Sequence, residues 1–373
     1  MKGLRLGKLT IKTVLLLITV VMAVTMLLSA WGGLVSPEKS RLLPLATLAM
    51  PLVLIVNVVM ALVWLCMFKW KYALIPIVAI AVSWSPVSMV CPLNFFAKIV
   101  DNDKSFRVMT FNVANFGPYD PSNHNPSKSM RYILDQDADF VLLQEGSQER
   151  TYLALSNVKM MANEVEQKYP YHSDGWRDLM ILSKYPYTVV PDSAFDVLHE
   201  AHGGVYAKAF DIELPNSKQL RILNLHLRSI GMGEGDKNLY ADITKRGVNV
   251  QKRSELRKIK HSLFDKLDRA FKRHAEEAVI VRGLIDNSPG NLIVCGDFNE
   301  TPASYCYRAI RGDDLSDTFQ DCGAGLTWTF YDRRLFFKID HIMYRGEIEA
   351  VDWKRDKEGD SDHYPQVATF VWK

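Results

Sequence analysis

The sequence lacks the signatures of a cysteine-based metal site. Its five cysteines form no CxxC pair and no Cys/His ligand spacing, which excludes that class of site. Internal repeats and low-complexity stretches are absent as well, and a formal net charge of +3 selects no class of partner. Cys306 and Cys322 are compatible with a disulfide in an oxidising compartment or with two plain core thiols.

Charge is missing from three runs within the first hundred residues, and the third run is interrupted by two prolines. About 20 apolar residues cross a bilayer as a helix. We therefore expect residues 1–98 to form a membrane anchor with three transmembrane helices, at about 13–35, 42–68 and 72–90. A signal peptide is the alternative for the basic start, but two further spans would not follow it at once.

Basic residues in short loops set the expected orientation of these spans. Four lie in the N-terminal tail and two more, Lys69 and Lys71, in the loop after the second run, against five on the other side. This small excess favours a cytoplasmic N-terminus, and three spans then place the large domain outside the cytoplasm. A third span that fails to cross would reverse that answer.

Short apolar stretches alternate with helix-like segments from residue 106 onward. Most are rich in Val, Ile, Leu and Phe rather than strictly alternating, which indicates sheets covered on both faces. We expect residues 99–373 to form an α/β domain of two packed mixed sheets with helices outside. The expected strands are 106–112, 139–145, 179–183, 205–212, 219–227, 291–297, 338–344 and 366–372.

The segment 244–285 is rich in lysine and arginine and also carries an apolar stripe. The simpler interpretation is an amphipathic surface helix with its stripe on the core and a solvated basic face. The alternative is a basic face that meets a phosphate-bearing substrate or anionic lipid head groups. The stripe recurs at helical spacing over Leu256, Ile259, Leu263, Leu267 and Phe271.

Polar side chains occur at six predicted strand ends. The stretch GDFN presents Asp297 and Asn299 two residues apart, which puts both on one face of an extended segment. Alone, GDFN would fit a simple turn. The other strand ends make that interpretation weaker, because they supply Asn112 in TFN, Glu145 in LLQE, His226 in NLHL, Asp340 in KID, and Asp362 with His363 in SDHYP.

In this order the motifs resemble those of the endonuclease/exonuclease/phosphatase superfamily, the DNase I-like metal-dependent phosphoesterases. The resemblance covers roughly residues 105–373 and rests on TFNVANF, LLQE, NLHL, GDFN, KIDHI and SDHYP, with ILSKYP in addition. It implies a four-layer α/β sandwich. The N-terminal block resembles the bacterial membrane-anchored branch, which implies a multi-pass protein of the bacterial inner membrane.

The resemblance also implies a divalent cation, Mg²⁺ or alternatively Mn²⁺. A hard cation on oxygen ligands offsets the charge of a phosphodiester and stabilises the transition state. Glu145 is the expected principal metal ligand. Asn112 is expected on the metal or on a phosphate oxygen, and Asp362 near the metal.

The remaining motif residues are expected to act on the substrate. Asp297 would orient or deprotonate the attacking water, and Asn299 would hold phosphate or metal. His363, oriented by Asp340, would stabilise charge on a phosphate oxygen, and His226 would contact phosphate or protonate the leaving oxygen. The motifs leave open which residue is the base and which the acid.

Four further residues are open to a structural or a functional interpretation. His341 follows Asp340 on a strand, so we expect it to point away and to be structural. Trp328 is either a core residue or a wall of the pocket. Arg333 or Arg334 could face the substrate, although plain surface charge is the simpler explanation.

The expected function is a membrane-anchored, metal-dependent phosphoesterase that hydrolyses phosphodiester bonds in a nuclease-like manner. The alternatives are a phospholipid or sphingomyelin-type phosphodiesterase, a phosphoinositide phosphatase and, more remotely, a non-enzymatic membrane scaffold. A nuclease should show a basic groove that follows several phosphates. A lipid-directed enzyme should have an apolar rim and a pocket near the bilayer.

Overall fold

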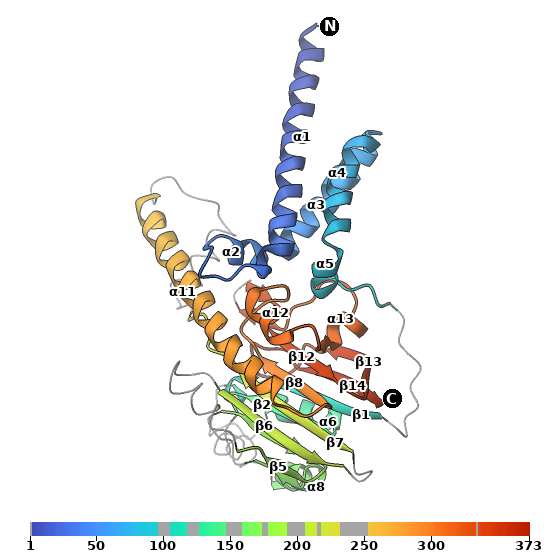
Figure 1. Ribbon diagram of the computed structural model, residues 1–373, viewed down its shortest axis with the longest axis vertical. Coiled ribbons are helices and arrows are strands. Elements are labelled where there is room, and N and C mark those ends of the chain that lie inside the picture. Colours follow the sequence, from blue (N-terminus) through green and yellow to red (C-terminus); the bar gives the residue numbers. More distant parts are fainter. Residues whose placement is uncertain are drawn as a thin grey trace.

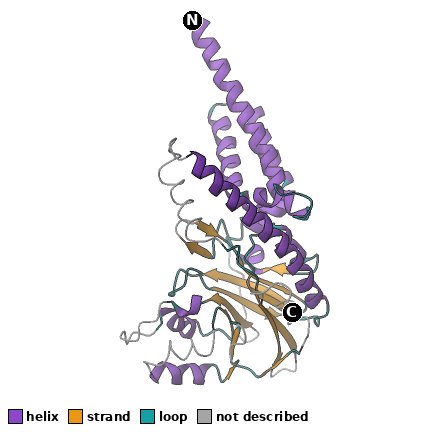
Figure 2. Cartoon of the chain, turned by 90° about the vertical axis from the view of Figure 1, so that its left-hand side faces the viewer, coloured by secondary structure: helices purple, strands orange, loops and turns teal. Residues whose placement is uncertain are grey.

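A computed structural model describes most of the 373-residue chain. The described residues are 2–95, 105–117, 127–146, 159–173, 178–191, 206–214, 218–231, 253–332 and 335–373. Arg333 and Arg334 lie outside them. A group of N-terminal helices projects from one end of an α/β domain (Figures 1 and 2).

The N-terminal helices differ from three straight spans. Only α1 is long and apolar enough to cross a membrane by itself, over Ile11–Leu34, and a second span requires α4 and α5 to count as one helix despite a bend of 74°. The predicted span 42–68 is broken, leaving a helix of 17 residues, α3. The prediction of three full spans is therefore wrong for the described residues. The elements are α1 (Lys2–Trp31), η1 (Gly32–Leu34), α2 (Leu43–Leu48), α3 (Met50–Cys66), α4 (Trp70–Val82) and α5 (Trp84–Val90).

Prolines account for both breaks. Pro51 lies in the first turn of α3, where its missing N–H costs nothing and where it favours a new helix start. Pro86 follows closely on the bend between α4 and α5. A proline removes a backbone donor and restricts the preceding residue, so a helix bends or restarts near it. Apolar composition alone does not reveal such breaks.

The strands of the described residues form two six-stranded sheets and a two-stranded hairpin. One sheet has the order β13-β14-β1-β2-β4-β3 and the other β5-β6-β7-β8-β12-β9, with β10-β11 apart. All eight predicted strands are present. The strands are β1 (Ser105–Asn112), β2 (Phe140–Gln144), β3 (Tyr171–His172), β4 (Met180–Ser183), β5 (Tyr187–Val189), β6 (Tyr206–Glu213), β7 (Gln219–His226), β8 (Leu292–Asp297), β9 (Ser316–Asp317), β10 (Phe330–Asp332), β11 (Leu335–Phe337), β12 (Asp340–Arg345), β13 (Ile348–Arg355) and β14 (Gln366–Trp372).

The two sheets pack face to face, and helices cover their outer faces. Side chains alternate along β1, so that Phe106 and Val108 join the core between the sheets while Met109 and Phe111 face α6 (Lys128–Gln136). The helix α8 (Lys159–Lys168) lies on the same side, and α11 (Arg253–Asp286) with α12 (Tyr305–Arg311) covers the other sheet. The predicted packing of two mixed sheets with outer helices is confirmed.

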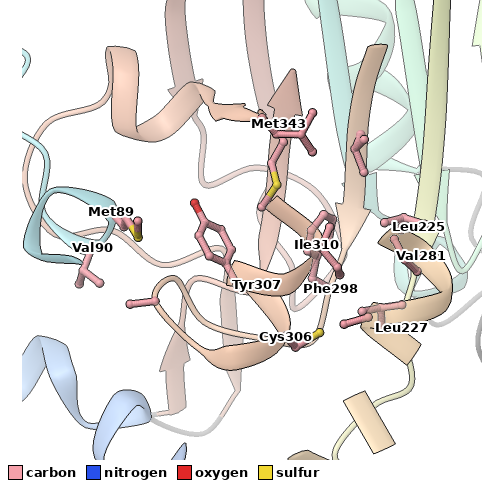
Figure 3. Packing of buried hydrophobic residues seen from close by; sticks show 14 of the residues in the cluster. Met89, Val90, Leu225, Leu227, Val281, Phe298, Cys306, Tyr307, Ile310 and Met343 are labelled. Atoms are coloured by element: carbon pink, nitrogen blue, oxygen red, sulfur yellow. The ribbon is translucent and has the colours of Figure 1, made fainter. Parts of the chain in front are cut away.

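The N-terminal helices share one buried apolar cluster with the α/β domain. Met89 and Val90 of α5 lie on the same side of the cluster as Tyr307 of α12, and Phe298 and Met343 extend it toward the sheet (Figure 3). The Arg308 guanidinium donates a hydrogen bond to the carbonyl of Ala30 at 3.0 Å. The two parts of the chain are therefore packed on each other.

The cysteines are all free thiols. Cys306 is buried in the apolar cluster and Cys322 is partly exposed. The interpretation of these two residues as unpaired thiols is the one that the structure matches.

Candidate active site

The sheet topology brings the predicted strand ends together. The pairs β1/β2 and β7/β8 are parallel, and the carboxyl ends of parallel strands meet at one edge of a sheet. Asn112 ends β1 and Glu145 follows β2, whereas His226 ends β7 and Asp297 ends β8. Because the two sheets pack face to face, these four side chains meet across the sandwich.

The segment around Asp297 requires a glycine. Gly296 has φ +136°, and a Cβ there would lie 1.9 Å from the carbonyl oxygen of Leu225. The absence of a side chain thus lets β8 run close beside β7. That approach sets Asp297 opposite His226 in the register of the two strands.

Asn112 joins the two carboxylates. Its Nδ2 donates hydrogen bonds to Glu145 Oε1 and to Asp297 Oδ2, both at 3.1 Å. Its Oδ1 accepts from the backbone N–H of Ala114 at 3.1 Å, so the amide oxygen is turned away from the carboxylates. In this orientation the Asn112 amide links the two carboxylates, and its predicted place on the metal or on a phosphate oxygen stays a prediction.

His363 lies between two buried carboxylates. Its Nδ1 is 3.1 Å from Asp340 Oδ2, and its Nε2 is 3.6 Å from Asp297 Oδ2. Burial alone would lower the pKa of His363, but the charges of Asp340 and Asp297 outweigh it and raise the pKa to about 10. Asp340 pairs with Asp297 across β12 and β8. His363 is therefore held by Asp340, whose charge favours the imidazolium form.

Asp297 is the most perturbed carboxylate of the group. Burial raises its pKa; the charges of His363 and His226 lower it and that of Asp340 raises it, to a net value of about 6. Its Oδ1 accepts the backbone N–H of Asn299 at 2.9 Å. A carboxyl group with this pKa can accept a proton near neutral pH.

His226 and Asn299 both lie close to Asp297. His226 Nε2 is 3.8 Å from both Glu145 Oε1 and Asp297 Oδ2. Asn299 uses its Nδ2 to donate to the carbonyl of Leu227 at 2.9 Å, and it also lines the cavity described next. All the predicted site residues thus lie in one neighbourhood.

A cavity of about 420 Å³ opens beside these groups. It is lined by Glu145, His226, Asp297, Asn299 and Asp362 together with His363 and many apolar side chains. Burial and the charge of Glu145 raise the pKa of Asp362, whereas His363 opposes the shift. The carboxylates greatly outnumber the cationic groups at this end of the cavity.

The donor set fits a hard divalent cation. Carboxylate oxygens are the ligands that Mg²⁺ and Mn²⁺ prefer, and one ligand atom each from Asp297, Asp340 and His363 lies within 4.8 Å of the others. Four acidic side chains around one imidazolium would repel an anionic phosphate ester. Glu145 and Asp362 would hold the cation, Asp297 would face the attacking water, and His363 remains bonded to Asp340.

Sequence reasoning missed Lys338. Its buried ammonium donates to the carbonyl of Asp340 at 3.0 Å and lies 2.9 Å from Nδ1 of His341. Burial lowers the pKa of Lys338 against the opposing charges of Asp317 and Asp340. The His341 side chain points away from the cavity, as expected, and its Nε2 contacts the carbonyl of Glu300 at 2.9 Å. A lone lysine between aromatic and apolar residues gave no sequence signal.

The aromatic wall of the site is Phe330, which the sequence analysis did not select. Its ring meets that of His363 edge to face at 5.0 Å. Trp328 packs on Phe336 at 5.3 Å and under Arg355, and it is not among the residues lining the cavity. Trp328 is partly exposed, so it is neither a buried core residue nor a wall of this cavity.

The fold and the site define a DNase I-like phosphoesterase architecture. Residues 109–363 match the Endonuclease/Exonuclease/phosphatase family, and the chain belongs to this family. Residues 12–90 match a second family, described as a domain of unknown function (DUF8431).

Solved structures with this fold share little sequence with the chain. An endonuclease/exonuclease/phosphatase from Beutenbergia cavernae is 16% identical over 72% of each chain, with a TM-score of 0.46. A humanized D. rerio TDP2 is 14% identical over 71% of this chain and 98% of its own, with a TM-score of 0.45. A mannosyl-6-phosphatase from Bacteroides thetaiotaomicron is 15% identical over 72% and 100%, with a TM-score of 0.42. No curated protein matches the chain.

Proposed function

We propose that the protein is a membrane-anchored, divalent-metal-dependent hydrolase of phosphodiester bonds. The observation that carries this proposal is the meeting of Glu145, Asp297 and the Asp340–His363 pair at one end of a cavity. A non-enzymatic scaffold would have no need for buried, mutually repelling carboxylates, which destabilise a fold. The substrate is a phosphate ester of a nucleic acid or of a lipid head group.

The proposed reaction is an in-line attack of water on phosphorus. Asp297 takes a proton from the water as the new O–P bond forms, and its pKa of about 6 suits that task. The imidazolium of His363 donates a hydrogen bond to a non-bridging oxygen. His226 gives a proton to the leaving oxygen as the old P–O bond breaks; the reverse assignment of base and acid is the alternative. Bound Mg²⁺ or Mn²⁺ would supply Lewis acidity and charge neutralisation.

We further propose two domains, an anchor over residues 1–98 and a catalytic domain over 99–373. The matches at 12–90 and 109–363 support a boundary between them. The α1 helix supports attachment to a bacterial inner membrane, with the lipid bilayer as a partner. We propose that α3 and α4 form an antiparallel pair beside α1, because Asn57 of α3 donates to the carbonyl of Met22 at 3.0 Å and Lys12 lies over the ring of Tyr72 at 4.7 Å.

Metal removal tests the reaction. The full-length protein in lipid nanodiscs should hydrolyse bis-p-nitrophenyl phosphate with Mg²⁺ or Mn²⁺, lose that activity in EDTA and regain it when the cation is restored. Glu145→Gln and His363→Gln should each lower kcat by roughly 10²- to 10⁴-fold. Glu347→Gln, at an exposed position on the far edge, is the matched control and should keep the wild-type rate. An EDTA-insensitive rate would exclude the metal.

A further inference from the structure

The cavity beside the carboxylates has an apolar half. Besides the site residues, its lining consists of ten apolar residues and the polar Ser229, Glu300 and Thr301. Among the described residues that line it, none is lysine or arginine. The apolar lining consists of Leu48, Ala114, Ile230, Leu263, Leu267, Phe271, Phe330, Leu335, Phe337 and Ile339.

One wall of the apolar half belongs to α11. Leu263, Leu267 and Phe271 recur every four residues, so they lie above one another on a single face of the helix. The sequence analysis expected this stripe to pack on the core. Instead these three residues line the cavity, and the core contacts of α11 come from later positions such as Ala278 and Val281. The stripe therefore faces the space that leads to the catalytic groups.

The lining also includes a residue of the N-terminal block. Leu48 ends α2, which lies beside α11 (Figure 1). Arg41, just before α2, forms an ion pair with Asp268 of α11 at 2.8 Å. This pair joins the block to the helix one residue beyond Leu267. The cavity is thus built jointly by the apolar N-terminal block and the catalytic domain.

This lining disfavours a polynucleotide. Binding of nucleic acid depends on lysine and arginine side chains that neutralise successive phosphates, and the cavity offers none among its described residues. Apolar surface next to a phosphate site instead gains free energy by burying hydrocarbon. A volume of about 420 Å³ suits one phosphate group and the adjoining part of one chain.

We propose that the substrate is a membrane lipid whose phosphate ester lies at Asp297 and His363 while its hydrocarbon chain lies between Leu48 and Leu267. The choice of a lipid rests on the continuity of the apolar half with the catalytic groups and on the origin of Leu48 in the block that carries the apolar helices. The inference depends on the proposed phosphodiesterase function and narrows its substrate class.

A homologous series of diesters tests the inference. Methyl, butyl and octyl p-nitrophenyl phosphate share the reacting bond and the leaving group, and they differ only in the alkyl chain. With the full-length protein in nanodiscs and Mg²⁺ present, kcat/KM should rise by up to about fourfold per methylene over the first few carbons. Partition of the longer esters into the nanodisc adds to this trend, so the wild-type series alone is not decisive.

Variants of the lining distinguish the effect of the cavity on kcat/KM from the effect of ester partition into the nanodisc. Leu48→Gln and Leu267→Gln change the apolar lining on α2 and on α11 and leave partition untouched, and each should lower the octyl-to-methyl ratio of kcat/KM at least tenfold. Val279→Gln places the same side chain on an exposed part of α11 and should keep the wild-type ratio. The isothermal-titration affinity for octylphosphonate relative to methylphosphonate should fall in the same two variants, which gives a readout independent of turnover.

Different results would contradict the lipid assignment and the proposed phosphodiesterase function. An octyl-to-methyl ratio that is unchanged in both wall variants overturns the lipid assignment and leaves the phosphodiesterase intact. An oligonucleotide cleaved with a higher kcat/KM than the octyl ester overturns it as well. Failure to cleave any member of the series overturns the proposed function and this inference with it.

Discussion

Two residues of the site hold backbone conformations that side chains rarely adopt. Glu145 has φ +52° and Asn299 has φ +50°. The left-handed region costs a non-glycine residue about 1 kcal/mol or more. In both cases the turn follows closely on a central strand, and the residue itself lines the cavity. The backbone strain at these two positions therefore accompanies the geometry of the site.

A buried histidine outside the reaction sets a pH dependence of stability. His274 Nδ1 lies 2.7 Å from Glu300 Oε1, and its Nε2 lies 2.6 Å from the carbonyl of Arg228. Burial alone would lower the pKa of His274, but the hydrogen bond and charge of Glu300 outweigh it and raise the pKa above its usual value. Folding therefore favours the protonated form. The resulting stabilisation is complete below about pH 6.5 and is lost as the pH rises through the raised pKa.

We expect His274→Gln to lower the free energy of unfolding by about 1.5–3 kcal/mol below pH 6.5, because a hydrogen bond to a charged group is lost. The difference from the wild type should shrink at alkaline pH. Melting temperatures across pH 5.5–9 measure it, and His172→Gln at an exposed site is the control. A constant difference over that range would contradict an imidazolium at position 274.

At the residue level, the sequence allowed prediction of the site residues that belong to recognisable motifs. Asp297, Asp340 and His363 occur in short stretches at strand ends. The pairing of neighbouring strands brings such ends to the same edge of a sheet. Lys338 and Phe330 carry no such signal, because their roles arise from contacts between segments that are distant in the chain. The orientation of the Asn112 amide was equally beyond reach, since the N–H of Ala114 decides it.

Among the elements, α11 shows how far periodicity reaches. A spacing of four residues predicts a helix with an apolar face, and the helix is present as Arg253–Asp286. Periodicity does not reveal what the face contacts. The same stripe would suit a core or a substrate cavity, and only the position of α2 decides between them. The strand β13 went unpredicted because its sequence IEAVDWKR mixes charged and apolar residues, as an edge strand with a bulge permits.

The junction between η1 and the α/β domain depends on a glycine. A Cβ on Gly33 would lie 1.9 Å from the carbonyl oxygen of Ala303, so Gly33→Ala should separate the two parts and lower the melting temperature by several degrees. Gly283 lies within α11 with no atom within 4 Å of an added Cβ. As the matched control, Gly283→Ala should stabilise the protein by up to about 1 kcal/mol. Equal effects of both substitutions would contradict a close junction.

For the whole molecule, the arrangement of the helices predicts its orientation. The ends of α1 and α4 that approach the α/β domain lie opposite the N-terminus and the Lys69–Lys71 turn (Figure 1). Since basic segments stay in the cytoplasm, we expect the catalytic domain outside it. Alkaline phosphatase fused after Lys373 should be active in a bacterial host, and green fluorescent protein at the same position should be dark. The opposite pattern would place the domain in the cytoplasm.

The overall architecture was the most predictable level of all. Eight apolar stretches in alternation with helical segments indicated two covered sheets, and both sheets are present. The anchor was less predictable, because Pro51 and Pro86 interrupt runs whose composition alone suggests continuous spans. Composition reports how apolar a run is, whereas proline positions decide how long each helix can be.

The close approach of Gly33 to Ala303 and the hydrogen bond from Arg308 to Ala30 fix the N-terminal helices against the α/β domain. An enzyme joined to a membrane helix by a long flexible linker can reach substrates at many distances from the bilayer. This one would keep its cleft at a constant height above the lipid surface. Its turnover would then follow the mole fraction of substrate in the leaflet, and diluting that leaflet with inert lipid would slow it even when the bulk concentration stays the same.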